Sequence, residues 1–313
     1  MGELAALLAA LTWSATSVAL TSLSARTSPV VLSGLRLGFG ALAMPPILWA
    51  SGESSTIADA PLSTIAQVVA SGALGYGLGD TLYILTLNRL GMQRTFPVSM
   101  ALYIGLTVLF GVLLLNEPFS WGLPAGALLI GVGTWLIVIP VAAAADRIPP
   151  PAVAAPDPAP VLVQPAPLYA PPGPAGYALL GGVGVTWAAA TLWLAAASGD
   201  LGAIAAGTIR TPAGAVALLG FALAFQRPAL AAPLRNPRHL GAIALAGLVG
   251  TTIGSLLYVY AVVTAGAART AILSSTSPLL ALPLSVAFLG ERLTRRILAG
   301  TLLCVAGIVL VVL

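Results

Sequence analysis

The sequence of 313 residues contains no lysine, one cysteine and one histidine. Without lysine, the chain cannot carry the G-x-x-x-x-G-K-[ST] loop that binds nucleotide phosphates. The single cysteine, Cys304, excludes an internal disulfide, and together with the single histidine, His239, it cannot build a zinc site. The sequence therefore predicts neither a metal ion nor a cofactor.

Charged residues are also scarce, at 7% of the chain, and the net charge is +4. The thirteen basic residues are all arginines, and they lie singly or in small groups along the chain. No basic patch of the kind that binds DNA or RNA is present. The sequence therefore predicts no nucleic-acid partner.

Apolar residues, in contrast, make up 58% of the chain, and the mean hydropathy is +1.01. A soluble core of this size cannot bury so much apolar surface, whereas a lipid bilayer accepts it. The composition predicts a multi-pass protein of the cell membrane (plasma or inner membrane), with the lipid bilayer as a partner.

Ten apolar windows are long enough to cross a bilayer, which takes about 20 residues per helix. The first window carries Glu3 and lacks a basic leader, so we do not interpret it as a cleavable signal. The predicted fold class is an all-α integral membrane protein with ten transmembrane helices. The windows lie at roughly 4–23, 30–50, 64–87, 95–115, 121–140, 176–197, 202–224, 240–263, 270–289 and 297–313.

Residues 141–175 separate the fifth window from the sixth and are rich in proline and alanine. This composition excludes a packed helix or sheet and favours an extended, solvent-exposed linker. The chain is therefore predicted to contain two domains of five helices each, at residues 1–140 and 176–313.

The two predicted domains repeat each other in sequence. Segment 71–95 aligns with segment 246–270, and with a shift of one residue Trp13 meets Trp187 and Arg36 meets Arg210. The two halves are therefore an internal duplication. The other matched pairs are Gly72 and Gly247, Gly75 and Gly250, Gly79 and Gly254, Tyr83 and Tyr258, Gly91 and Gly266, Arg94 and Arg269, and Thr95 and Thr270.

The number of helices in each half determines how the halves are oriented. Because five is odd, two five-helix copies joined by one loop enter the membrane from opposite faces, which makes an inverted repeat. Such a repeat places a binding site near the midplane, between halves that can rock against each other. The sequence therefore predicts alternating access to a central cavity.

Three motifs occur in the same order in both halves. A tryptophan lies in the first helix (TWSA, VTWAA), an arginine early in the second (GLRLG, TIRTP) and a glutamate after the fourth (LLNEPFSWG, FLGERLTRR). In this order, twice, they resemble the EamA-like members of the drug/metabolite transporter superfamily. The resemblance implies a secondary carrier rather than an enzyme. Its expected substrates are small metabolites such as amino acids, nucleosides or amphipathic drugs, exported or exchanged, often against protons.

Two features depart from the family pattern. Tyr103 occupies the place in the fourth helix that Pro278 takes in the ninth, and the linker is unusually long. The first difference means that the two halves need not bend alike.

Three charged residues lie inside predicted spans, namely Arg36, Asp80 and Arg210. A charge at a helix centre costs about 2.5–3.5 kcal/mol on insertion scales. Arg36 and Asp80 each lie about seven residues from helix ends at the same membrane face, roughly 10 Å deep, which predicts a side-chain pair. That pair either only neutralises two charges and joins two helices, or takes part in proton coupling.

Arg210 differs from Arg36 because the position that matches Asp80 is Ser255. An unpaired guanidinium in a bilayer interior is costly, so Arg210 is expected to face a wet cavity or a partner. Glu117 is one candidate partner from the same membrane face. Our hypothesis is instead that Arg210 binds an anionic group of the substrate in a bidentate pair.

Further candidates for the cavity are aromatic and hydroxyl residues. Trp13, Trp187, Tyr83 and Tyr258 can each offer a ring to a substrate, although packing is the commoner role of such rings. The ninth helix carries a run of hydroxyl residues, including Ser275 and Ser277, before Pro278. This pattern predicts a kinked, cavity-lining helix, although such hydroxyls also bond back to their own backbone.

Two rival functions are weaker. Residues 77–80 read GLGD, a phrase that intramembrane aspartyl proteases carry at one of two catalytic carboxylates. Asp80 is the only acid in a predicted span, and Gly72, Gly75 and Gly79 are explained more simply by close helix packing. A non-transporting membrane scaffold accounts for the apolar bulk but not for the buried charges.

The loops that follow odd-numbered helices hold ten arginines, whereas the other loops hold only Arg269. The positive-inside rule therefore predicts both termini outside. The family resemblance more often implies termini inside, and we prefer the charge count. Glu117 and Glu291 are interpreted as caps of the helices that follow them. The sequence leaves open the substrate, the coupling ion, the direction of transport and whether the protein is a homodimer.

Overall fold

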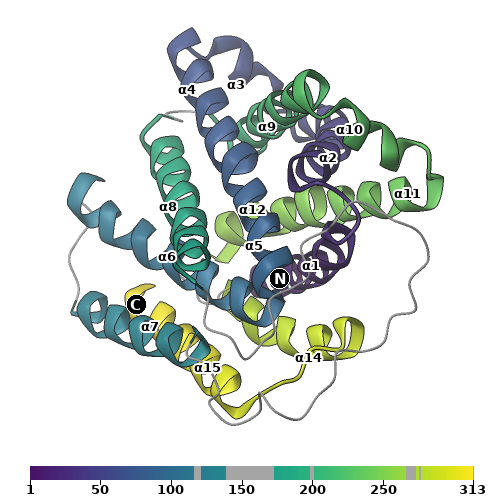
Figure 1. The fold of residues 1–313 in the computed structure, drawn as a ribbon. Helices are drawn as coiled ribbons and strands as arrows, with labels where there is room; N and C mark the ends of the chain where they lie inside the picture. The colour runs from purple at the N-terminus through teal and green to yellow at the C-terminus, as the bar shows by residue number, and fades with distance from the viewer. Residues whose placement is uncertain (116–120, 139–172, 198–200, 266–272, 275, 313) are drawn as a thin grey trace.

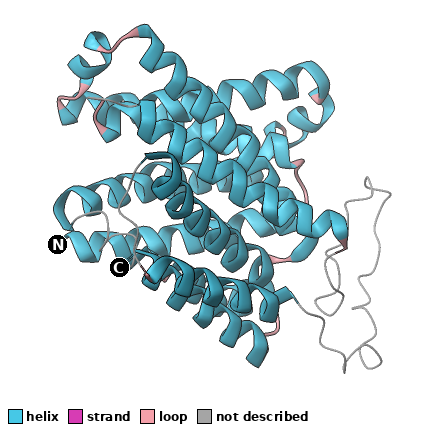
Figure 2. Cartoon of the chain, turned by 90° about the vertical axis from the view of Figure 1, so that its left-hand side faces the viewer, coloured by secondary structure: helices cyan, strands magenta, loops and turns pink. Residues whose placement is uncertain are grey.

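A computed structural model describes residues 1–115, 121–138, 173–197, 201–265, 273–274 and 276–312. The regular elements within these ranges are all helices (Figures 1 and 2). Glu117, Gly266, Arg269, Thr270, Ser275 and linker residues 141–172 lie outside the described residues.

The described residues of the first half form eight helical elements. They are α1 (Gly2–Ser24), α2 (Pro29–Ser51), α3 (Ser54–Asp59), α4 (Leu62–Gly72), η1 (Ala73–Gly79), α5 (Asp80–Leu90), α6 (Met92–Leu115) and α7 (Gly122–Val138). Among the described residues, the second half repeats this order, with residues 266–272 and 275 lying outside the description. Its elements are α8 (Pro174–Ala197), α9 (Ala203–Phe225), α10 (Arg227–Leu234), α11 (Pro237–Ala246), η2 (Gly247–Ile253), α12 (Gly254–Ala265), α14 (Ser277–Leu289) and α15 (Arg295–Val312).

Six helical stretches in the described part of the chain are long and apolar enough to span a membrane. They are Gly2–Ser24, Pro29–Ser51, Leu62–Leu90, Pro174–Leu194, Ile204–Phe225 and Pro237–Tyr258. Two shorter apolar helices cover Pro124–Ile137 and Ser277–Leu289. Each of the ten predicted windows contains helix, but the count of ten complete spans stays a prediction.

The short helices α3 and α10 were not predicted. Each lies between the second and third long helices of its half. Gly52 ends α2 with a φ of 77°, a left-handed conformation that glycine adopts without strain, and the chain then turns into α3. At the matching place, Gln226 separates α9 from α10. The extra helices thus occur as a matched pair.

The third long helix of each half contains a π-helical segment at nearly matched positions. η1 follows α4 and η2 follows α11, and both coincide with the repeated glycines. A π-helical segment inserts a local distortion into an α-helix and frequently occurs at functional sites. The duplicated glycine pattern therefore encodes a duplicated distortion.

The long helices pair across the two halves. α2 packs against α9, and α7 packs against α15, as Figure 1 shows. A Cβ added at Gly133 in α7 would lie 2.6 Å from the carbonyl oxygen of Gly300 in α15, and the reverse distance is also 2.6 Å. Small residues at such crossings allow membrane helices to approach closely.

The repeated glycines make reciprocal contacts between the halves. A Cβ at Gly72 would lie 2.5 Å from the carbonyl oxygen of Arg210, and a Cβ at Gly247 would overlap the carbonyl oxygen of Arg36. Each half therefore places its third helix against the arginine-bearing helix of the other half. Such mutual contacts are those of two copies related by a two-fold axis.

Glu291 corrects one prediction. Its carboxylate accepts hydrogen bonds from the backbone N–H groups of Met92 at 2.8 Å and Gln93 at 3.1 Å. It therefore caps the first turn of α6, rather than α15, which follows it in the chain. The N-terminus of any helix carries partial positive charge and attracts a carboxylate. Tertiary packing places the N-terminus of α6, rather than that of α15, next to Glu291.

Candidate functional site

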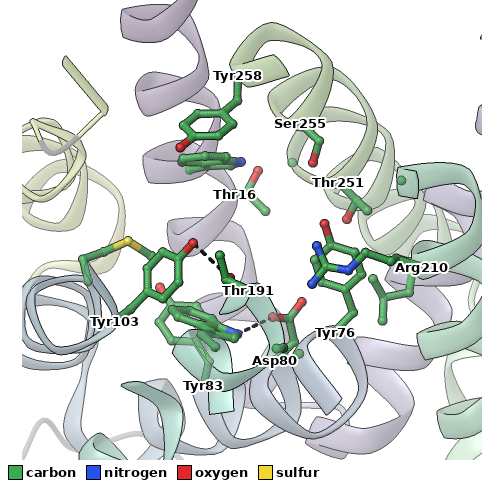
Figure 3. A pocket seen from close by; sticks show the side chains of 18 of the residues that line it. Thr16, Tyr76, Asp80, Tyr83, Tyr103, Thr191, Arg210, Thr251, Ser255 and Tyr258 are labelled. Atoms are coloured by element: carbon green, nitrogen blue, oxygen red, sulfur yellow. Dashed lines mark hydrogen bonds between the residues drawn. The ribbon is translucent and has the colours of Figure 1, made fainter. Parts of the chain in front are cut away.

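A cavity of about 560 Å³ lies between the two halves. This volume falls in the range of small-molecule sites, about 300–1,000 Å³. Its walls come from α1, α2, the η1 and α5 stretch and α6 of the first half, and from α8, α9, the η2 and α12 stretch and Ser274 of the second. Figure 3 shows how these side chains point into one space.

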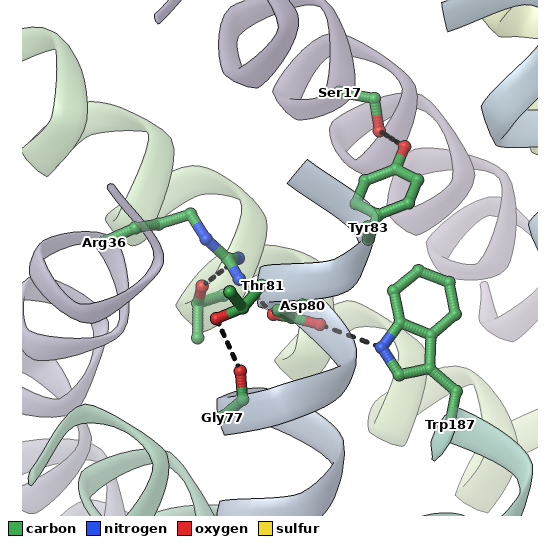
Figure 4. A network of polar contacts seen from close by, with 8 residues as sticks. Ser17, Arg36, Gly77, Asp80, Thr81, Tyr83 and Trp187 are labelled. Atoms are coloured by element: carbon green, nitrogen blue, oxygen red, sulfur yellow. Dashed lines mark hydrogen bonds and ion pairs between the residues drawn. The ribbon is translucent and has the colours of Figure 1, made fainter. Parts of the chain in front are cut away.

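An ion pair between Arg36 and Asp80 lies at the wall of this cavity, as the helix depths predicted. The two side chains are only 9% and 14% exposed. The other terminal nitrogen of Arg36 donates to the hydroxyl of Thr251 at 2.9 Å, and Trp187 Nε1 donates to the second carboxylate oxygen of Asp80 at 3.0 Å. The pair is therefore tied to the second half at both ends (Figure 4).

The local sequence explains why Trp187 reaches Asp80. Gly79 directly precedes Asp80, and a Cβ at Gly79 would lie 2.6 Å from Cδ1 and 2.9 Å from Nε1 of Trp187. Only glycine leaves room for the indole at this point. In the second half, Gly254 faces Trp13 in the same way, with a Cβ distance of 2.8 Å to Nε1. The glycine rows therefore have two roles: they allow close helix packing, and Gly79 and Gly254 leave space for the indole rings of Trp187 and Trp13.

Arg210 lines the same cavity without an ion pair among the described residues. Its guanidinium lies over the ring of Tyr76, 4.7 Å from the ring centroid. Its Nε is buried and has no hydrogen-bond partner within the described ranges. Glu117 lies outside the described residues, so a contact between Arg210 and Glu117 stays a prediction.

The four predicted aromatic residues all line the cavity. Trp13 packs on Tyr258 with ring centroids 5.3 Å apart, and Trp187 packs on Tyr83 at 5.1 Å. The hydroxyl of Tyr83 donates to Ser17 Oγ at 2.8 Å. The rings therefore form two matched pairs, each joining one half to the other.

The hydroxyl residues of the ninth window are placed differently from the prediction. Ser277 is 1% exposed and does not line the cavity; its hydroxyl donates back to the carbonyl of Ser274. Ser274 lines the cavity instead. Pro278 lies in the first turn of α14. Residues 273–274 are also helical and Thr276 forms a turn, so the helical structure of the ninth window changes direction or breaks directly before Pro278, at the place where the kink was predicted. The first turn tolerates proline because its N–H groups have no partner inside the helix.

Several lining residues were not predicted, notably Tyr76, Thr251, Tyr103 and Thr191. The hydroxyl of Tyr103 lies 3.3 Å from that of Thr191. Tyr76 and Thr251 are each other's counterparts in the repeat, and each contacts the arginine of the opposite half. Their place between the repeated glycines was the signal in the sequence that could have identified them.

The site does not offer the groups that the rival enzyme needs. Asp80 is the only carboxylate among the described residues that line the cavity. The two-carboxylate centre of an aspartyl protease is therefore not formed by these residues. In the described ranges, no group of three or more His, Cys, Asp or Glu residues is placed to hold a metal ion.

The fold and the site define a class of protein: a multi-pass helical membrane transporter with an internal repeat and a cavity between the repeats. The family can also be named. The chain belongs to the EamA-like transporter family of the drug/metabolite transporter superfamily, because the family model matches residues 1–139 and 174–313. The resemblance seen in the sequence is thereby confirmed.

Two further comparisons give a similar protein and a similar fold. The probable 4-amino-4-deoxy-L-arabinose-phosphoundecaprenol flippase subunit ArnF of Erwinia tasmaniensis is 36% identical over 110 residues, which are 34% of this chain and 84% of that protein. The match therefore covers about one third of this chain. A solved crystal structure of 19% identity covers 99% of this chain and 96% of its own, with a TM-score of 0.61, and shows the same fold.

Proposed function

We propose that this protein is a secondary active transporter that works by alternating access and couples the transport of a small metabolite to protons. Amino acids, nucleosides and amphipathic drugs are the expected range of substrates, and the cell membrane (plasma or inner membrane) is the expected location. The observation that carries the proposal is a cavity between the two duplicated halves. Its wall contains the buried carboxylate of Asp80, which is bonded to residues of both halves.

The contacts between the halves suit alternating access. The third helix of each half packs through its glycines against the second helix of the other half. Few interlocking side chains at this contact therefore have to separate when the halves move relative to each other. Because each half is predicted to have five spans, the two-fold axis implied by the reciprocal contacts would lie in the membrane plane. Opening at one face would then be matched by closing at the other.

Asp80 is the group through which a proton would act. Its carboxylate bonds Arg36 in the first half and Trp187 in the second, and Arg36 in turn bonds Thr251 of the second half. Protonation of Asp80 would remove the negative charge that holds this network together. A proton would therefore shift the balance between two arrangements of the halves, which is what coupling requires.

Purified protein in liposomes with an imposed pH gradient would test this proposal. Wild-type protein should accumulate at least one compound from a panel of amino acids, nucleosides and drugs. Asp80→Asn should lose accumulation driven by the gradient but keep exchange between equal pools. Asp80→Asn leaves Arg36 without its ion-pair partner. The double variant Asp80→Asn with Arg36→Gln therefore provides a second test, in which neither side chain of the pair is charged. Accumulation by both variants with unchanged proton stoichiometry would show that the pair only joins two helices.

A second candidate function is movement of a lipid-linked sugar, because the matched relative is named as a subunit of such a flippase. A cavity of about 560 Å³ holds a head group, while a long lipid chain would have to stay in the bilayer. Transfer of a fluorescent lipid-linked sugar between leaflets, measured in the same liposomes without any accumulation of water-soluble compounds, would favour this candidate.

The orientation proposed from the arginine count is tested separately. A reporter that is active only in the cytoplasm, fused after Leu313, should be inactive if both termini lie outside. Activity of that reporter would instead support the orientation that the family resemblance implies.

A further inference from the structure

We infer that the cavity binds an amphipathic organic monoanion, with the anionic group on Arg210 and the apolar body against the aromatic rings. The inference rests on the proposed function and names the substrate class of that site. It comes from the charge balance of the cavity, the engagement of each charged group and the distribution of the rings.

The charged groups in the cavity wall do not balance. Among the described lining residues they are Arg36, Arg210 and Asp80, so the formal sum of two positive charges and one negative charge is +1. A net charge inside a membrane protein is costly unless water or a partner compensates it. One negative charge on the substrate would make the loaded cavity neutral.

Only Arg210 is available to receive that charge. Both terminal nitrogens of Arg36 are engaged, one by Asp80 and the other by Thr251. The Nε atoms of both arginines are buried without a hydrogen-bond partner among the described residues. The terminal nitrogens of Arg210 differ from those of Arg36 because no hydrogen bond within the described ranges engages them, and the guanidinium of Arg210 contacts the face of Tyr76. A planar guanidinium that is fixed on a ring but has unused N–H groups is suited to bidentate binding of a carboxylate or a similar anion.

Small and polar residues surround the guanidinium of Arg210 where it faces the cavity. A Cβ at Gly75 would lie 3.3 Å from a terminal nitrogen of Arg210, so a larger residue there would crowd the guanidinium. Figure 3 shows Tyr76, Thr251 and Ser255 on the same side of the cavity as Arg210, and Ser255 places a hydroxyl where the repeat would otherwise have a carboxylate. This side of the cavity is polar without carrying a negative charge of its own.

The remainder of the wall is apolar and aromatic. In Figure 3, Tyr103 and Tyr258 lie on the opposite side from Arg210. Other apolar lining residues are Trp13, Leu20, Phe96, Met100, Ile104 and Leu194. Rings of this kind bind the apolar part of a ligand through contact area and ring stacking. The ligand is therefore expected to combine one anionic group with an apolar or aromatic body.

The same geometry disfavours zwitterions and cations. An ammonium group binds best to a carboxylate, but one oxygen of Asp80 is held by Arg36 and the other by Trp187. The buried side-chain acceptors without a partner among the described lining residues are neutral hydroxyl oxygens, those of Thr16 and Ser274. An ammonium group would also add to a cavity that is already positive. The cavity should therefore discriminate against the amine of an otherwise identical compound.

Binding of four matched probes to purified protein in detergent, measured by isothermal titration calorimetry, tests the inference. The probes are 3-phenylpropionate, its neutral amide, 3-phenylpropylamine and phenylalanine, which share a phenyl ring and differ in charge. Wild-type protein should bind 3-phenylpropionate at least about tenfold more tightly than the amide, the size expected for a hydrogen-bonded charge pair. The amine and phenylalanine should bind more weakly still.

Variants of the protein identify the residue responsible. Arg210→Gln should abolish the preference for 3-phenylpropionate over the amide, and Arg210→Lys should retain part of it because lysine lacks the planar fork. Arg235→Gln removes the same charge from an exposed residue at the end of α10 and should leave the preference unchanged. If Arg210→Gln does not fold, Ser255→Asp provides a second test, because it neutralises the cavity by adding a carboxylate near Arg210.

The inference is overturned if the amine or phenylalanine binds as tightly as 3-phenylpropionate, or if no binding of 3-phenylpropionate is detected at millimolar concentration. It is also overturned if both Arg210→Gln and Ser255→Asp keep the full preference. The calorimetry does not depend on transport. Selective anion binding without any transport in liposomes would therefore contradict only the proposed function, whereas transport of amines in preference to anions would contradict only this inference.

Discussion

The third long helices of the two halves share their packing but differ in their chemistry. Both have a glycine row, a π-helical segment and a tryptophan from the opposite half. The first half adds Tyr76 and Asp80, where the second has Thr251 and Ser255. Within these two helices the glycines that allow close packing are thus repeated, whereas the two cavity-facing positions that contact or match the charged groups, 76/251 and 80/255, are not. A symmetric scaffold here supports an asymmetric site.

A second difference lies in the fourth and ninth windows. α6 is continuous from Met92 to Leu115 with Pro97 inside it, whereas α14 begins only at Ser277. Tyr103 of α6 lines the cavity, and its counterpart Pro278 is buried at the start of α14. The halves therefore do not bend alike, as the difference between these two residues indicated.

The largest expected effect comes from removing the charge that only one half has. Asp80→Asn leaves Arg36 buried without its partner, which should lower the free energy of unfolding by about 3–5 kcal/mol. Ser255→Ala at the matching position should lower it by less than about 1 kcal/mol. Denaturant unfolding in detergent measures both. The double variant Asp80→Asn with Arg36→Gln should recover most of the loss, and equal effects at Asp80 and Ser255 would contradict the asymmetry.

The next largest effect should be the same in both halves. A methyl group at Gly72 or Gly247 meets the backbone of Arg210 or Arg36, so Gly72→Ala and Gly247→Ala should each destabilise the protein by about 2 kcal/mol. Gly181→Ala is the matched control, because nothing lies within 4 Å of its added Cβ. Thermal unfolding in detergent measures the three variants. A large effect in one half alone would mean that the glycine rows are not equivalent.

A third variant makes the site more symmetric. Ser255→Asp gives Arg210 the carboxylate that Arg36 already has, so the cavity becomes neutral. The preference for 3-phenylpropionate over its amide should then fall about tenfold, or about 1.4 kcal/mol. Calorimetry measures this ratio. Ser255→Asn, which adds a side chain of similar size without charge, should keep the preference; if it loses the preference equally, size rather than charge is responsible.

The smallest effect concerns the caps at the ends of α2 and α9. Glu53 accepts a hydrogen bond from the backbone N–H of Ala205 at 3.0 Å, in the first turn of α9, and Gln226 accepts one from the hydroxyl of Ser28 at 2.7 Å, before α2. The start of α9 is thus capped by Glu53, from the turn after α2, whereas Gln226, which follows α9, bonds the hydroxyl of Ser28 just before α2. Glu53→Gln should destabilise by about 0.5–1 kcal/mol, and Gln226→Glu should stabilise by about 0.3–1 kcal/mol.

Salt distinguishes the cause of these small changes. Thermal unfolding at low and high salt should show both effects shrinking at high salt, because a carboxylate at a helix start acts electrostatically. Effects of Glu53→Gln and Gln226→Glu that are independent of salt would point to altered packing instead.

Much of the site was accessible from the sequence through the repeat. Arg36, Asp80, Arg210 and the four aromatic residues were selected because charge and repetition inside apolar windows are local signals, and the structure places all seven at the cavity. Their roles in binding and coupling stay predictions. Tyr76 was missed because a tyrosine beside glycines looks like packing until its arginine partner is known.

Other predictions failed because the partner lies far away along the chain. Glu291 was assigned to the helix that follows it, but it caps α6, about 200 residues earlier in sequence. Ser277 was expected to line the cavity, but it begins α14 and its side chain is buried. Helix boundaries depend on local capping, and no periodic signal marks them within a uniformly apolar stretch.

The sequence by itself determined that the chain belongs in a membrane, that its halves are duplicates and that three charges lie within apolar windows. These properties follow from composition, spacing and self-similarity, which any reader of the sequence can measure. Only the tertiary structure decided that Trp187 bonds Asp80, that Thr251 bonds Arg36 and that Tyr76 supports Arg210. Each of these contacts joins opposite halves. Each depends on the rotation of two helices about their axes and on how closely the helices pack. Hydrophobic patterning does not determine either property when a helix is apolar on all sides.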